Sequence, residues 1–387
     1  MKGTVMGVMK QILTGVVLAA FATPALADMK IGIVVSATGP ASSLGIPERN
    51  ALTLAPKEIA GQRVSYVVLD DASDPTAARR SIERLASEDK VDLVIGSSTS
   101  PSSLAMVEVA GRSKTPMISL GASRAIIYPM DDNKKWVFKT PYNDAITAAA
   151  TVKHMVANNI RRVATVAVND AYGEGWVKEF KPLAEAAGIT LVASELYGAK
   201  DTSVTAQILK VLAARPDAVL ITASGTPGTL PQIALAERGF KGKVYQTTGV
   251  VNADFIRVGG KAVEGTLIAA NPLSVAAQLP DSNPAKAAGL AFTKDYDAAH
   301  GAGTTSAFAG YAWDAVMLLE AATPVALKSA APGTEQFRVA LRDAIENLKN
   351  VSTTAGPVSM TNDDHNGYAA DAPVIITVKD GKFTVAP

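Results

Sequence analysis

The feature that most constrains the fold is an alternation of short apolar runs with longer segments of helical periodicity. Apolar runs of strand length lie at 30–35, 64–69, 91–95 and 116–119. Segments with helical spacing lie between them, at 47–59, 75–87 and 102–112. Short apolar strands separated by helices are typical of a parallel sheet that is covered on both faces. We therefore expect an α/β fold.

A second series of the same kind follows, and the 387 residues have room for two domains. Its predicted strands lie at 162–168, 190–197, 218–222, 243–247 and 265–269. Its predicted helices lie at 144–158, 176–187, 203–214 and 229–239. A helical block and a terminal hairpin complete the chain, with helices at 285–299, 306–322 and 334–348 and strands at 374–378 and 382–385. This pattern predicts two doubly wound lobes.

The composition excludes several functional classes. The chain is 48% hydrophobic and 19% charged with a net charge of +1, so it gives no sign of disorder or of binding to nucleic acid. It contains no cysteine, which rules out a cysteine nucleophile, a thiolate metal site and a lipid-modified N-terminal cysteine.

The first 27 residues have the pattern of a secretory signal peptide. Lys2 and Lys10 form a basic region, 12–22 is apolar, and Ala25 and Ala27 form a small-x-small cleavage site. We expect cleavage after Ala27 and a periplasmic protein without direct membrane insertion, because no later stretch is apolar enough to span a bilayer.

Hydroxyl side chains gather after the predicted strand 91–95. They are Ser97, Ser98, Thr99, Ser100, Ser102 and Ser103. The following helix has free N–H groups and a positive dipole end at its N-terminus, so this loop is a candidate anion site. The loop contains no Lys or Arg, which favours a small anion such as a carboxylate. The alternative is a run of helix N-caps without a ligand.

Tests for catalytic and cofactor motifs are negative. The sequence lacks G-x-S-x-G, H-E-x-x-H, Walker A and G-x-G-x-x-G motifs. Its three histidines are far apart, and Asp70–Asp71 is interpreted as a solvated turn. We predict no catalytic residue, metal or cofactor. Tyr172 leads into the predicted helix 176–187, with Gly173 and Gly175 after it, which permit close approach of a ligand or another backbone; the alternative is a half-buried surface aromatic residue.

Six landmarks in order resemble the periplasmic solute-binding proteins of branched-chain amino acid type ABC transporters. They are 38–45, Asp70–Asp71, 96–100, 116–123, 169–175, and 356–359 before Asn366–Gly367. The resemblance implies a type I periplasmic binding protein fold with two lobes joined by three crossovers, near 139–141, 270–272 and 355–357. The first lobe would contain 28–140 and 272–355, and the second 141–271 and 356–387.

The resemblance also implies site residues. The ligand carboxylate would be held by the hydroxyl loop with Ser98 and Ser100, and by Gly121, Ala122 and Ser123 after the next strand. Tyr172 would close over the ligand from the second lobe, and Leu44 replaces a common aromatic wall residue.

One departure bears on the ligand. Amino-acid binders of this family hold the ligand ammonium with an acid where this chain has Thr248, followed by Gly249, and the loop 223–228 offers Thr226 but no acid. A buried ammonium without a carboxylate partner costs several kcal/mol. We therefore expect an aromatic or other organic acid that lacks an α-amino group.

Alternative functions differ in class. The resemblance implies delivery of the ligand to an inner-membrane ABC permease by a monomeric receptor. Binding of branched-chain or other amino acids is the first alternative, and a periplasmic sensor of the same ligand is the second. An enzyme is disfavoured by the missing motifs.

Overall fold

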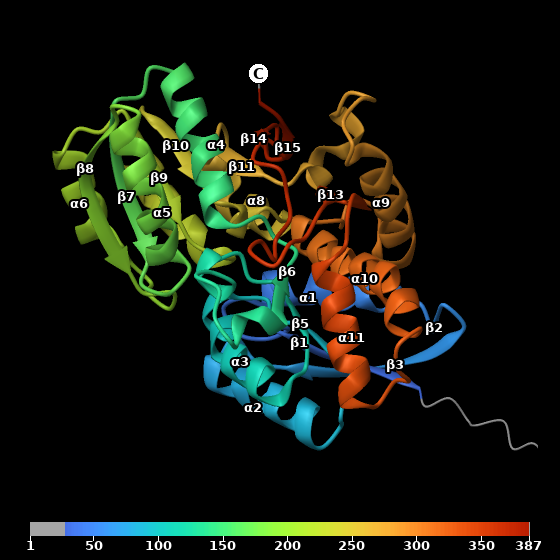
Figure 1. Ribbon diagram of the computed structural model, residues 1–387. Coiled ribbons are helices and arrows are strands. Elements are labelled where there is room, and N and C mark those ends of the chain that lie inside the picture. Colours follow the sequence, from blue (N-terminus) through green and yellow to red (C-terminus); the bar gives the residue numbers. More distant parts are fainter. Residues whose placement is uncertain (1–27, 387) are drawn as a thin grey trace, which may run out of the picture.

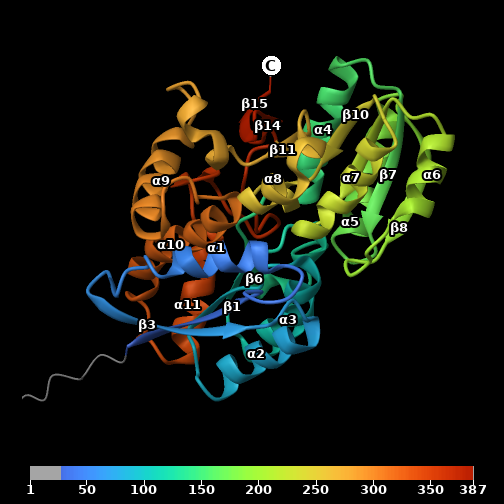
Figure 2. The ribbon, with the colours of Figure 1, turned by 180° about the vertical axis from the view of Figure 1, so that it is seen from behind.

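The computed structural model describes residues 28–386. The predicted signal peptide and its cleavage site lie outside the described residues. Two sheets, each covered by helices on both faces, form two lobes (Figures 1 and 2).

The first lobe contains a six-stranded sheet of order β2-β3-β1-β4-β5-β6. Its strands are β1 (Met29–Val35), β2 (Glu58–Ile59), β3 (Gln62–Asp70), β4 (Leu93–Gly96), β5 (Met117–Ser119) and β6 (Val137–Lys139). All neighbours pair in parallel except β2 and β3, which form an antiparallel hairpin. The carboxyl ends of five strands thus lie at one edge of the sheet.

The second lobe contains a seven-stranded sheet of order β15-β14-β11-β10-β9-β7-β8. Its strands are β7 (Arg162–Val168), β8 (Thr190–Tyr197), β9 (Ala218–Thr222), β10 (Lys243–Gln246), β11 (Leu267–Ala270), β14 (Val374–Lys379) and β15 (Lys382–Val385). The first five pair in parallel, and β14 and β15 are added as an antiparallel hairpin beside β11.

Eleven α-helices cover these sheets in the part of the chain that the structure describes. They are α1 (Ser42–Leu52), α2 (Pro75–Ser87), α3 (Ser100–Ser113), α4 (Asp144–Ala157), α5 (Gly173–Ala186), α6 (Thr205–Ala213), α7 (Thr229–Glu237), α8 (Ala253–Gly259), α9 (Lys286–His300), α10 (Ala307–Ala326) and α11 (Glu335–Glu346). Short 3-10 turns, η1 (Arg124–Ile126), η3 (Thr226–Gly228) and η4 (Thr248–Val250), follow β5, β9 and β10.

Alternation along each strand explains the layers. In β1, Ile31 and Ile33 are buried with residues of α1 and α10 on one face, whereas Val34 packs with α2 and α3 on the other. In the second lobe, α4 and α5 cover one face of the sheet and α6 and α7 the other. Because both faces of each sheet are buried, the sequences of the strands are nearly continuous apolar runs.

The chain passes between the lobes three times. It leaves the first sheet after β6 and the second after β11, and it crosses again beyond the small hairpin of β12 (Val351–Thr353) and β13 (Gly356–Val358). The helices α10 and α11, orange in Figure 1, return to the first lobe and lie beside the blue N-terminal segments, where α10 packs on α1. Asn366 links the first and third crossings, because its side-chain amide donates to the carbonyls of Lys139 and Pro141 at 3.1 and 2.8 Å.

The structure corrects several helix boundaries and one burial prediction. Helix α5 begins at Gly173 rather than 176, α10 ends at Ala326 rather than 322, and the prediction lacks α8. The first helix spans Ser42–Leu52 rather than 47–59. Pro56 explains the early end, because a proline restricts the preceding residue and cannot continue the helical hydrogen bonds. The helix predicted at 102–112 begins at Ser100 with Thr99 as its N-cap. The solvated-turn interpretation is wrong for Asp71, whose side chain is fully buried.

Within residues 28–386, the structure has no helix with both the length and the apolar character needed for a membrane span.

Candidate functional site

The loops at the carboxyl ends of the two parallel sheets face each other and touch. Ala122, after β5, packs against the second-lobe cluster that contains Tyr172 and Trp176. Arg124 forms an ion pair with Glu179 of α5 across the boundary at 3.6 Å. These contacts define the inter-lobe region, in which ligands of open α/β sheets bind.

Hydrogen bonds inside the first lobe hold most of the hydroxyl run. Ser36 and Ser97 both donate to the carboxyl group of buried Asp71. Ser98 donates to Glu48 and accepts from the Ser36 N–H at 2.8 Å. Both hydrogen bonds of the Ser98 hydroxyl are therefore made within the first lobe. This is consistent with Ser98 holding the loop in place rather than contacting the ligand.

The same network extends to the next loop. Ser103 donates to the carbonyl of Ser97 at 2.9 Å, and Ser119 donates to Ser103 at 2.8 Å. The N–H of Gly121 donates to the Ser119 hydroxyl at 3.0 Å. A chain of hydrogen bonds thus fixes the loops after β4 and β5 relative to each other.

Ser100 and Ser123 are linked across the two loops, and each has a hydroxyl that accepts a hydrogen bond. The Ser100 oxygen accepts from the Ser123 N–H at 3.0 Å, and the Ser123 oxygen accepts from the Ala125 N–H at 3.3 Å. Neither hydroxyl donates a hydrogen bond within the described residues, although each carries one O–H donor. Both side chains are at least 97% buried, and Ser100 is the first residue of α3. Two free donors at a helix N-terminus are suited to a carboxylate.

A buried lysine lies behind this loop. Lys139 of β6 donates to the carbonyl of Ala122 at 2.5 Å, and the Arg124 N–H donates to Asp144 at 3.4 Å. Burial lowers the pKa of Lys139 and raises the pKa of Asp144, and each charge counters the other residue's shift. The loop that would hold a carboxylate is thus backed by a charge-compensated pair.

The second lobe contributes polar groups with few fixed partners. Tyr172 precedes α5, is 2% exposed, and faces Thr247, Thr248 and the backbone of Gly249. Its hydroxyl makes no hydrogen bond of good geometry within the described chain. Burial raises the pKa of Tyr172, and the nearby Asp144 raises it further. This phenol is neutral at physiological pH and is available to a ligand.

The remaining predicted site residues lie at the same boundary. A Cβ built at Gly225 would lie 3.1 Å from Ser43 Oγ and 3.3 Å from a methyl carbon of Leu44, so Leu44 borders the loop that carries half-buried Thr226. Gly249 accepts from the Gly225 N–H at 2.7 Å. A Cβ at Gly249 would lie 2.3 Å from the carbonyl oxygen of Ala223, which explains the glycine.

Sequence reasoning missed three buried polar residues. Tyr311 of α10 is 2% exposed and faces Thr248 across the lobe boundary. Glu48 of α1 is fully buried, and burial raises its pKa well above the usual value. Lys139 is the third. Each is a large polar residue in a largely apolar, buried element, which is the signal that could have drawn attention to them.

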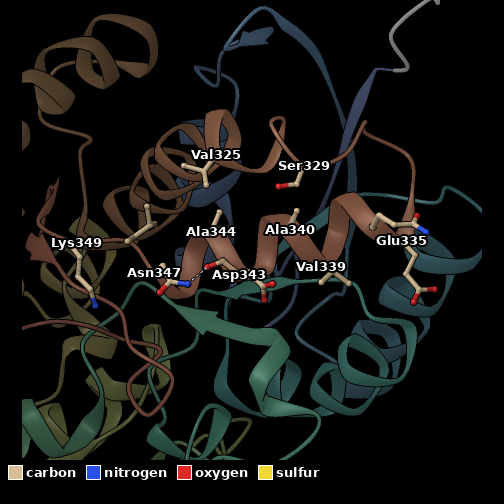
Figure 3. A pocket seen from close by; sticks show the side chains of 11 residues that line it. Val325, Ser329, Glu335, Val339, Ala340, Asp343, Ala344, Asn347 and Lys349 are labelled. Carbon is tan, nitrogen blue, oxygen red and sulfur yellow. Dashed lines mark hydrogen bonds between the residues drawn. The ribbon is translucent and has the colours of Figure 1, made fainter.

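The described residues also form a surface pocket of about 640 Å³ in another place. It lies between the end of α10 and α11, and its lining includes Val325 of α10 with Val339 and Ala344 of α11 (Figure 3). No residue predicted for the ligand site lines it, so we do not assign the ligand to this pocket.

Comparisons with known proteins agree with this architecture. A family model described as periplasmic binding protein matches residues 28–382. The Leu/Ile/Val-binding protein BraC3 of Rhizobium johnstonii is 27% identical over 347 residues, which cover 88% of this chain and 89% of that protein.

Solved structures show the same fold. An extracellular ligand-binding receptor from Rhodopseudomonas palustris HaA2 is 43% identical, with a TM-score of 0.90 over 93% of this chain and 100% of that one. A solute-binding protein of an R. palustris ABC transporter, solved in complex with benzoate, is 24% identical, with a TM-score of 0.77 over 93% and 95% of the two chains. This last likeness concerns the fold alone. The chain therefore belongs to the periplasmic binding protein family and has its two-lobed type I fold.

Proposed function

We propose that this protein is a periplasmic receptor that closes its two lobes around a small carboxylate without an α-amino group and delivers it to an inner-membrane ABC permease. The proposed binding units are 28–140 with 272–355 and 141–271 with 356–387. The proposed contacts are those predicted from the sequence, with Ser100 and Gly121–Ser123 at the carboxylate. Tyr172, Thr226, Thr248, Gly249 and Leu44 surround the rest of the ligand.

The observation that carries the proposal is the pair of free hydroxyl donors on Ser100 and Ser123. Buried donors need acceptors, and a carboxylate supplies them at this helix N-terminus. The charge of such a ligand is compatible with the buried Lys139 behind the loop.

The missing amino group is argued from the acids near the boundary. Glu48 favours its neutral form because burial raises its pKa, and Asp144 is compensated by Lys139. Neither is well suited to hold an ammonium ion. The benzoate complex of the R. palustris protein is consistent with this ligand class, since benzoate has a carboxylate and no amino group.

Binding of a branched-chain amino acid is the second candidate. The name of the BraC3 relative favours it. A sensor role for the same ligand would use the same site without a permease.

A thermal-shift screen followed by calorimetric titration tests the ligand class. The panel pairs leucine, valine and phenylalanine with benzoate, phenylacetate, cinnamate and short keto acids. We expect a rise in melting temperature with the acids and none with the amino acids, because a ligand of the folded state stabilises it according to its occupancy. A shift with leucine or valine alone would overturn the proposed ligand class.

A further inference from the structure

Several buried polar atoms near the lobe boundary make no hydrogen bond of good geometry within residues 28–386. Among them are Ser43 Oγ, one carboxyl oxygen of Glu48, and the hydroxyl oxygens of Tyr172 and Tyr311. An unsatisfied buried polar group costs about 1–3 kcal/mol, so several in one region indicate a binding partner that supplies the missing hydrogen bonds.

Three of these groups converge from different elements. Tyr311 and Tyr172 both face Thr248, although they belong to α10 and to the start of α5. Glu48 and Tyr172 each act electrostatically on Tyr311, so the three side chains lie within range of one another. Packing of α1 on α10 brings Glu48 to this place.

The position relative to the carboxylate loop follows from the neighbours. Glu48 holds the hydroxyl of Ser98, two residues before Ser100. Tyr172 lies within electrostatic range of Asp144, behind the loop of Ala122 and Ser123. The three unpaired groups therefore border the proposed ligand without belonging to the carboxylate contacts.

We propose that Glu48, Tyr172 and Tyr311 form a subsite for a hydroxyl group of the ligand, so that the preferred ligand is a hydroxylated carboxylic acid. This inference rests on the proposed function. A hydroxyl group can donate to the free Glu48 oxygen and accept from a tyrosine hydroxyl, whereas a methyl group of similar size can do neither. A second carboxylate would bring a charge next to an acid, and an ammonium would need an ionised partner.

The test compares ligands that differ in one group. Binding of benzoate, 4-methylbenzoate, 3-hydroxybenzoate and 4-hydroxybenzoate is measured by calorimetry, with cinnamate and 4-hydroxycinnamate as a longer pair. We expect at least one hydroxylated acid to bind about tenfold or more tighter than its parent and its methyl analogue, because a polar subsite rejects analogues that leave it unpaired.

Two variants locate the effect. Y311F and E48Q should each reduce the hydroxyl-to-methyl affinity ratio to about threefold or less. The control Y66F removes a phenol that donates to the carbonyl of Pro56 in the same lobe, and it should leave the ratio unchanged. The unliganded Y311F protein should melt no lower than the wild type, since its hydroxyl is unpaired; a purely structural tyrosine would lower the melting temperature.

The possible failures can be separated. If parent and hydroxylated acids bind equally, or if Y311F and E48Q leave the ratio intact, the subsite is overturned while the carboxylate receptor stands. If no acid of the panel binds, or leucine alone does, the proposed function fails and the subsite with it.

Discussion

The two lobes prepare their sides of the boundary in different ways. In the first lobe, Ser36, Ser97, Ser98, Ser103 and Ser119 all donate to partners within the lobe. In the second, the Tyr172 hydroxyl has no partner of good geometry in the described chain. The hydroxyl network of the loops after β1, β4 and β5 is thus built before a ligand arrives, whereas Tyr172 of the second lobe, like Glu48 and Tyr311 on the helices of the first, keeps a polar atom unpaired.

This difference has an energetic reason. A preformed half-site avoids the entropy cost of ordering its groups when the ligand binds. Polar groups left unpaired on the opposite side favour closure only when a ligand satisfies them. We therefore expect mutations in the hydrogen-bonded network of Ser36, Asp71 and Ser97 to lower stability, and mutations of the unpaired groups, such as Tyr172, to affect binding alone.

The largest effect should come from Asp71, which accepts from Ser36, Ser97 and the Ser73 N–H. D71A leaves two buried hydroxyl donors and one part-buried N–H unpaired, and we expect a loss of about 3 kcal/mol in the free energy of unfolding, measured by urea denaturation. The matched second-lobe variant T248A should lose less than about 1 kcal/mol. Equal losses would contradict the contrast between the lobes.

The next effect concerns the two free donors. In the double variant S100A/S123A, we expect carboxylate affinity to fall by about 100-fold, because hydrogen bonds to a charged group contribute about 1.5–3 kcal/mol each. Calorimetric titration with the tightest acid of the panel measures it. S113A is the control, since Ser113 donates to Val109 at the other end of α3. An unchanged affinity in the double variant would place the carboxylate elsewhere.

The stability of the protein should depend on pH through Asp314 of α10. The Asp314 carboxyl group accepts from the Thr354 N–H at 2.7 Å, next to the third crossing between the lobes. Burial raises its pKa from 3.8 to about 7. The folded state then binds more protons than the unfolded state between these values, so stability falls as pH rises from about 4 to about 7. We expect D314N to remove about 2 kcal/mol of the difference in unfolding free energy between pH 5 and pH 8. Urea denaturation at both pH values measures this difference. If the difference is the same in D314N and in the wild type, Asp314 is not the source of the pH dependence.

The smallest effect on affinity is expected from a pair of glycine variants that distinguishes closure of the lobes from folding. Gly225 has a φ of 69°, and its Cβ would press against Ser43 and Leu44 of the other lobe. Gly239 has a φ of 71° with open space around it. G239A should lose about 1 kcal/mol of stability from backbone strain, and G225A about 1–3 kcal/mol, because its φ of 69° is combined with a ψ of −158°, a region occupied almost only by glycine. We expect an additional fall in affinity, about tenfold, in G225A alone, because the new methyl group holds the lobes apart; the same affinity in both variants would argue against that.

The sequence predicted one part of the site better than the other. Within each lobe, the loops with Ser100 and Ser123 and those with Tyr172 and Thr248 follow parallel strands, whose carboxyl ends meet at one edge of the sheet, so each pair could be placed from the alternation. Glu48 and Tyr311 could not be placed this way. They lie on helix faces whose sequence pattern predicts burial in the core. Their proximity depends on how α1 packs against α10, a helix from a distant part of the chain.

The three crossings have a consequence for the order of folding. The apolar face of β1, with Ile31 and Ile33, is covered by α10, which begins at Ala307. During synthesis this face must wait for more than two hundred further residues, and the last strands of the second sheet arrive later still. Such long-range contacts slow folding and prolong the exposure of apolar surface. Neither lobe is a contiguous segment, so the nascent chain reaches its native state only when it is nearly finished.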